Sequence, residues 1–125
     1  MKYYILIFLF FIVSCKFGFD SKHIVDKYYL TEIDGRFDIS YNIKSDQYVG
    51  VVGPDVMELG YNDEYIWSKQ RNVETKKLTY YIIPIQKMVS QSPDDNKIGP
   101  FTKDELSKKM LELGISEYNF TMKVN

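Results

Sequence analysis

A chain of 125 residues is long enough for one domain and no more. Its formal net charge of −1 argues against an electrostatic nucleic-acid binder, because such domains carry a clear basic excess. The chain has one cysteine, so no intramolecular disulfide can form and stability must come from the core. Its many aromatic residues, 11 Tyr and 8 Phe among them, favour strands.

The N-terminus has the features of a signal peptide. Lys2 is followed by an uncharged apolar run over residues 3–13, and Lys16 closes the apolar region. As a helix this run would span about 16 Å, whereas a bilayer core is about 30 Å thick. The run is therefore too short to cross a membrane and suits the apolar region of a signal peptide over residues 1–14.

The residues after this run resemble the lipobox of bacterial lipoproteins, an aliphatic residue and a small one before a cysteine: Ile12, Val13, Ser14 and Cys15. The resemblance implies cleavage between Ser14 and Cys15 and a thioether to diacylglycerol on Cys15. It places the protein in the bacterial cell envelope, anchored through Cys15 to the extracytoplasmic side of a membrane. The alternatives are an incidental cysteine after an ordinary signal peptide and an uncleaved membrane anchor, which the length of the run disfavours.

The rest of the chain divides into a short tether and one globular domain. We expect the lipidated cysteine and its tether to occupy residues 15–25 and the domain to occupy residues 26–125. Residues 36–43 alternate between apolar and polar side chains, as half-buried strands do. Asp34-Gly35 before them indicates a type I′ hairpin turn. Strands are predicted over residues 26–33, 36–43, 47–52, 56–61, 64–70, 78–86 and 117–124. Pro84 lacks a ladder donor, which favours an edge or bulged position for its strand.

One helix is predicted, from about Lys103 to Leu113. Thr102 and Glu105 form a capping box at its start, and Gly114 suits the left-handed position after its last turn. Leu106, Met110 and Leu113 recur at helical spacing, so we expect this stripe to pack on the apolar face of a sheet. The fold class is therefore α+β and mainly β, an antiparallel sheet of six or seven short strands with one helix. The pattern leaves open whether this is a curved sheet or a half-open barrel.

The mature part is similar to a family of small, uncharacterised bacterial lipoprotein domains. The similarity spans most of residues 26–120 and rests on four short segments, residues 26–30, 60–70, 80–83 and 98–102. It implies a shared fold and no activity.

No residue pattern indicates a catalytic or metal site, and we expect no cofactor. His23 is the only histidine, whereas zinc needs about four nitrogen or sulfur ligands. Asp94, Asp95 and Asn96 lack the ligand spacing of a calcium loop. No histidine in the body could activate a serine as a nucleophile.

The segment over residues 61–71 is the candidate for binding a partner. If Ile66 points into the core, its neighbours on the other strand face are partly exposed beside two cations, as contact anchors are. These candidate residues are Tyr65, Trp67, Lys69 and Arg71. The simpler alternative is that Tyr65 and Trp67 pack under the helix or on the second side of the core.

We therefore expect a surface-tethered binding or interaction module with a membrane as one partner and a protein of the envelope as another. A structural or accessory envelope lipoprotein is the first alternative. A small hydrolase that uses two carboxylates is the second, and it needs two acids about 5–10 Å apart in one cleft.

Overall fold

The computed structural model describes residues 20–86 and 92–124, which form two antiparallel sheets and one α-helix. The first sheet has the order β1-β2-β3-β4, and the second has the order β8-β7-β6-β5-β9. The strands of the first sheet are β1 (Asp20–Val25), β2 (Tyr28–Ile33), β3 (Arg36–Lys44) and β4 (Gln47–Val52). Those of the second are β5 (Val56–Tyr61), β6 (Tyr65–Arg71), β7 (Leu78–Pro84), β8 (Ile98–Phe101) and β9 (Met122–Lys123).

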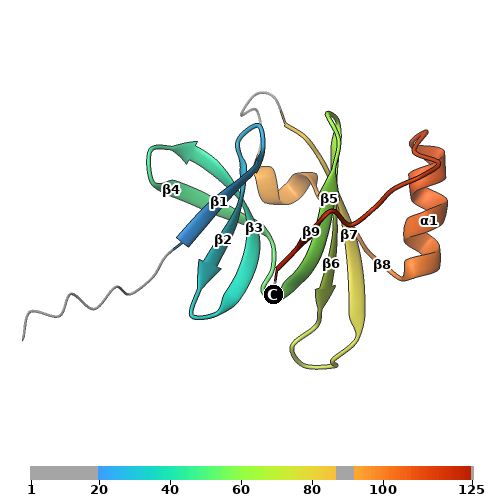
Figure 1. The fold of residues 1–125 in the computed structure, drawn as a ribbon, viewed down its shortest axis with the longest axis horizontal. Coiled ribbons are helices and arrows are strands. Elements are labelled where there is room, and N and C mark those ends of the chain that lie inside the picture. The colour runs from blue at the N-terminus through green and yellow to red at the C-terminus, as the bar shows by residue number, and fades with distance from the viewer. Residues whose placement is uncertain (1–19, 87–91, 125) are drawn as a thin grey trace, which may run out of the picture.

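The molecule has three layers, with the second sheet between the first sheet and the helix α1 (Lys103–Glu112) (Figure 1). One apolar core lies between the two sheets and includes Ile39, Tyr41 and Ile66. A second core lies between the outer face of the second sheet and α1, where Trp67 and Met110 pack. The sandwich is open, and the fold class is mainly β as the sequence predicts.

The helix forms as predicted, because its start and its buried stripe are both encoded locally. The Thr102 hydroxyl accepts from the Glu105 N–H at 3.3 Å, and the Glu105 carboxylate accepts from the Thr102 N–H at 3.2 Å. Leu106 and Met110 are fully buried against the second sheet. The capping box therefore fixes where α1 begins, and the apolar stripe fixes the face that packs.

The structure has two sheets where the sequence predicts one, and three segments differ from the predicted strands. Residues 20–25, expected in the tether, form the edge strand β1, whose mostly exposed side chains give no apolar alternation. Residues 98–101, where no strand is predicted, form β8, a short strand that contains Gly99 and Pro100. Residues 117–124 form a strand only at β9, because Tyr118 and Phe120 pack on the α1 side of the second sheet without a backbone ladder.

Pro84 is not on an edge strand, because β7 lies between β6 and β8, but the register of β7 with β8 shifts between Tyr80 and Ile82, in line with the bulge alternative. It is the last residue of β7, beyond the pairs that join β7 to β8, which end at Ile82↔Ile98. Pro84 also pairs with Tyr65 of β6. Because the next N–H, that of Ile85, donates to the Glu64 carbonyl on the β6 side, the Pro84 nitrogen lies on the other side, where the pairing with β8 has ended. Its carbonyl accepts a hydrogen bond from the Asn96 side-chain amide at 2.7 Å.

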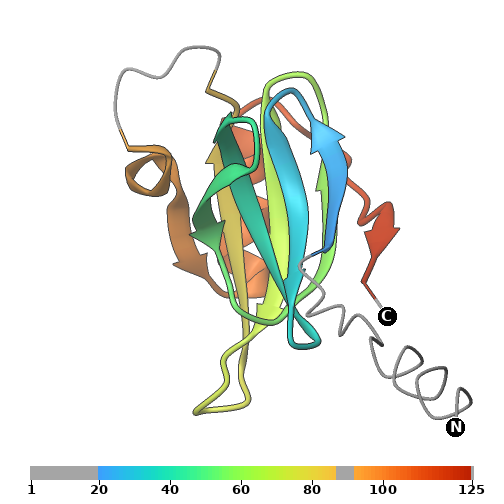
Figure 2. The ribbon, with the colours of Figure 1, turned by 90° about the vertical axis from the view of Figure 1, so that its left-hand side faces the viewer.

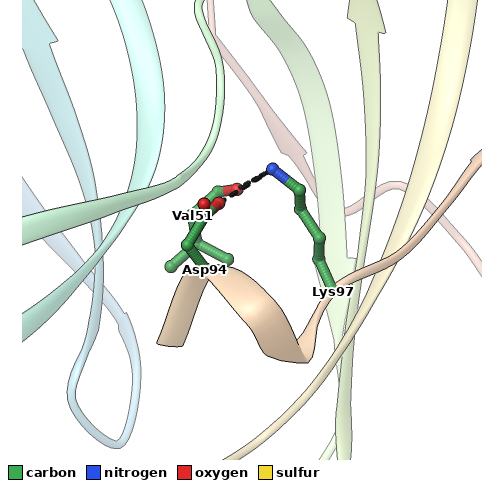
Figure 3. Close-up of polar contacts among 3 residues, drawn as sticks. All are labelled: Val51, Asp94 and Lys97. Carbon is green, nitrogen blue, oxygen red and sulfur yellow. Dashed lines mark hydrogen bonds and ion pairs between the residues drawn. The ribbon is translucent and has the colours of Figure 1, made fainter. Parts of the chain in front are cut away.

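A 3-10 helix, η2 (Pro93–Asn96), lies against β4 and ties the two sheets together on one side. The Lys97 ammonium, which follows η2, donates to the Val51 carbonyl of β4 at 3.0 Å and to the Asp94 carboxylate at 2.8 Å (Figure 3). Lys97 also lies 5.7 Å from the centre of the Tyr81 ring of β7. One side chain thus bridges the first sheet, η2 and the second sheet.

Candidate functional site

The four residues predicted to bind a partner do not form one exposed surface. Ile66 points into the core between the sheets, as expected, but Trp67 on the other face of β6 is only 5% exposed. The Trp67 ring packs under α1, and its indole N–H donates to the Asn119 carbonyl at 2.9 Å. For Trp67, the structure therefore shows the alternative in which the ring packs under the helix and is not exposed.

The other three residues separate along β6. Tyr65 is half-buried and packs on the same core as Trp67. The Lys69 ammonium lies 3.6 Å from the Glu58 carboxylate of β5, so its charge already has a partner. Arg71 is exposed at the end of β6, and it is the one member of the set that lines a pocket described below.

Arg71 belongs to a surface that we call the loop end. It consists of the β2–β3 turn (residues 34–35), the β4–β5 linker (residues 53–55) and the β6–β7 loop (residues 72–77), together with the strand residues that flank them. Figures 1 and 2 both show the β2–β3 and β6–β7 hairpins projecting at the same end of the molecule. The linker lies between them because it carries the chain from the first sheet to the second.

Local sequence explains the shape of each loop. Asp34 and Gly35 have φ values of 53° and 77°, the type I′ geometry predicted for this turn. The Asn72 carboxamide oxygen accepts from the N–H groups of Glu74 and Thr75 at 2.9 and 3.0 Å, which closes the β6–β7 loop. Short turns of this kind fix the course of the backbone in each loop.

Three shallow pockets lie at the loop end, and Pro54 lines two of them. The first, of about 410 Å³, is lined by Ile33, Asp34, Arg36, Asp38 and Pro54. The second, of about 320 Å³, lies between the hairpins and is lined by Gly35, Phe37, Asp55, Val56, Met57, Arg71 and Lys76. The third, of about 300 Å³, is lined by Gly53, Pro54 and residues 70–74. The two hairpins and the linker thus form one continuous recessed surface.

Asp38 is the carboxylate with the most unusual environment at the loop end. Burial raises the pKa of Asp38 above its ordinary value, and the nearby Asp55 charge raises it further. The carboxylate lies against the backbone of Gly53, where a Cβ atom would overlap it. Only glycine therefore fits at position 53 while Asp38 keeps this place.

The hydrolase alternative required two carboxylates in one cleft. Two carboxylates, Asp34 and Asp38, line the shallow first pocket, whereas Asp55 lines the second. Charges of both signs are present at the loop end, with Arg36, Arg71 and Lys76 beside the acids. Among the described residues, no group of three or more His, Cys, Asp or Glu could hold a metal ion.

Sequence reasoning missed the loop end as a site, although one signal was present. Asp34-Gly35 indicates a turn, but a sequence alone does not show that this turn lines the same surface as the linker over residues 53–55. The packing of the first sheet on the second brings them together. The lipobox residues Ile12, Val13, Ser14 and Cys15 lie outside the described residues.

The comparisons with known proteins assign a family. A family model described as a protein of unknown function (DUF3997) matches residues 25–124. The chain belongs to this family. No curated protein and no solved structure matches the chain.

The match to the DUF3997 family covers nearly all of the folded body, from the last residue of β1 to the residue after β9. The similarity that the sequence shows to uncharacterised domains is thus confirmed at the level of the family. Within the described residues, no helix is both long and apolar enough to cross a membrane.

Proposed function

We propose that this protein is an exported bacterial lipoprotein whose body is a binding or interaction module held on the extracytoplasmic side of a membrane. The observation that carries the proposal is the order of features at the N-terminus. An uncharged run over residues 3–13 leads into Ile12-Val13-Ser14-Cys15, and only residues 16–19 separate Cys15 from the first strand.

The cysteine content supports the anchoring role of Cys15. Cys15 is the only cysteine of the 125 residues, so no other thiol competes with it for modification. Each buried CH₂ group of an acyl chain contributes about 0.8 kcal/mol, so two or three chains would hold the protein on the membrane durably.

The loop end supports the role as a module. Its recessed surface has fixed turns, apolar and charged side chains, and Arg71 as a typical contact residue. We infer that contacts are made here, where residues are accessible, and not at Trp67, which is buried.

Incorporation of a fatty-acid analogue in growing bacteria tests the anchor. The wild type should take up the label, and Cys15→Ser, which removes the thiol while keeping the size, should not. Ser14→Ala is the matched control, because it keeps a small residue before Cys15 and should be labelled like the wild type. Equal labelling of Cys15→Ser and the wild type would contradict the proposal.

A further inference from the structure

We propose that the loop end lies on the lipid surface to which the chain is anchored, so that the membrane itself is the partner of this surface. The inference rests on the proposed lipid anchor and goes beyond it, because an anchor alone sets no orientation. It follows from where the chain enters the fold and from which side chains are exposed beside that point.

The chain enters the fold at the loop end. Asp20, the first residue of β1, pairs with Glu32, and Ile33 follows as the last residue of β2 before the turn. An extended chain spans at most about 3.6 Å per residue, so the Cα atoms of Cys15 and Asp20 are no more than about 18 Å apart. A lipidated Cys15 would therefore keep the loop end within reach of the membrane, and the side chains exposed there decide whether it makes contact.

Three large apolar side chains are exposed at this same end. Ile33 is 55% exposed beside the β2–β3 turn, Val73 is 36% exposed in the β6–β7 loop, and Leu78 is 43% exposed directly after it. Ile33 lines the first pocket and Val73 the third, and Pro54 lies between them in both linings. Exposed apolar side chains on two projecting hairpins suit insertion among lipid headgroups.

The charges at this end indicate what kind of contact to expect. Arg36, Arg71 and Lys76 accompany Asp34, Asp55 and other acids, so the surface has no basic excess. Attraction to anionic lipids is therefore not the main contribution to the free energy of this contact. The contact should depend on the apolar side chains and should persist at about 1 M salt, where the screening length is about 3 Å.

Because the tether is short, a weak contact between the loop end and the membrane is enough to orient the body. Because residues 16–19 hold the loop end within reach of the membrane, docking is intramolecular and proceeds at a high effective concentration. Two inserted side chains would then orient the body, although they would not bind a free protein to a membrane durably.

The test uses the mature lipidated protein in vesicles of phosphatidylethanolamine and phosphatidylglycerol that contain a spin-labelled lipid quencher. Lipidation consumes the thiol of Cys15, so one introduced cysteine carries the only free thiol for a fluorescent label. Glu74→Cys places the label beside Val73, and Asp46→Cys places it in the β3–β4 turn, at the opposite end of β3. Both original residues are exposed.

The label at Glu74→Cys should be quenched at least about two-fold more than the label at Asp46→Cys, because inserted groups lie about 5–10 Å into the headgroup boundary. The difference should persist at high salt. Replacing Ile33 and Val73 together by Ser should abolish it while the acyl mass of the N-terminus stays unchanged.

Equal quenching at the two positions, or an unchanged difference in the double Ser variant, would overturn this inference and leave the lipid anchor intact. A mature N-terminus without acyl mass would instead contradict the anchor, so the two failures are distinguishable. Equal quenching would also favour a protein as the partner of the loop end.

Discussion

At the scale of single residues, the most informative group is the Asp38 carboxylate. Burial raises its pKa, and the adjacent Asp55 charge raises it further, so the folded state disfavours the ionised form. A carboxylate kept in such a place at neutral pH reduces stability. The rest of the fold therefore stabilises the recessed surface around Pro54 and offsets the unfavourable free energy of burying this charge.

Asp38→Asn should raise the free energy of unfolding at neutral pH. Because the folded pKa lies above the unfolded one, the stability linked to Asp38 is fully present below about pH 4 and is lost as the pH rises through the folded pKa. The melting temperature of the variant should thus exceed that of the wild type at pH 7. The difference should shrink when both are measured at about pH 3. A variant that melts lower at pH 7 would contradict this reading of the site.

Gly53→Ala should destabilise the protein by about 1–3 kcal/mol, because its Cβ would overlap the Asp38 carboxylate at a φ of 157°. Gly35→Ala is the control, since its Cβ meets no atom within 4 Å and only its φ of 77° is unfavourable. Denaturant unfolding measures both. If the clash is the cause, adding Asp38→Ala to Gly53→Ala should restore part of the loss.

At the scale of elements, the sequence predicted the parts whose signals are local. The strands β3 to β7 and the helix α1 lie where alternation, Asp34-Gly35 and the capping box place them. The strand β1 is not predicted from the sequence, because an exposed edge strand with mostly polar side chains shows no alternation of apolar and polar residues. The face of Trp67 could not be assigned either, because both faces of β6 are covered, one by the first sheet and one by α1.

Trp67→Ala should lower the free energy of unfolding by about 3–5 kcal/mol, because it empties the core between the second sheet and α1 and removes the hydrogen bond to Asn119. Circular dichroism during denaturant unfolding measures this loss. Leu111→Ala, at the most exposed apolar position of α1, should change the stability little. Near-wild-type stability of Trp67→Ala would show that the ring is exposed, as a contact anchor would be.

Lys97→Met should lower the free energy of unfolding by about 1–2 kcal/mol, because it removes the hydrogen bond that joins η2 to the Val51 carbonyl while keeping the apolar stem. Asp94→Asn should have a smaller effect, since the Asp94 carboxylate is half-exposed and exposed ion pairs contribute little. Thermal unfolding of the two variants compares them directly. An equal loss in both would mean that the ion pair, and not the link to β4, stabilises this side of the sandwich.

At the scale of the whole molecule, the fold and the proposed address come from different parts of the chain. Among the described residues, the two cores are built from positions 24–124, and the DUF3997 family model matches residues 25–124. The proposed address depends on residues 1–15, which the sequence identifies by pattern alone. The loop end joins the two parts, because the tether enters the fold beside it.

Cys15→Ala should lose the firm attachment of the wild type to the membrane fraction. Without a thiol no thioether to lipid can form, and the apolar run over residues 3–13 is too short to span a bilayer. Carbonate extraction followed by fractionation measures the attachment. Arg71→Ala, which changes the loop end and leaves the anchor in place, should fractionate like the wild type.

The central claim is that Cys15 becomes the lipidated first residue of the mature protein, and the intact mass of the purified mature protein tests it most directly. We predict a chain that starts at Cys15 and carries the additional mass of a diacylglycerol group, with or without a further acyl chain. A mature protein with an unmodified Cys15 thiol, or one whose first residue lies elsewhere, would contradict the account.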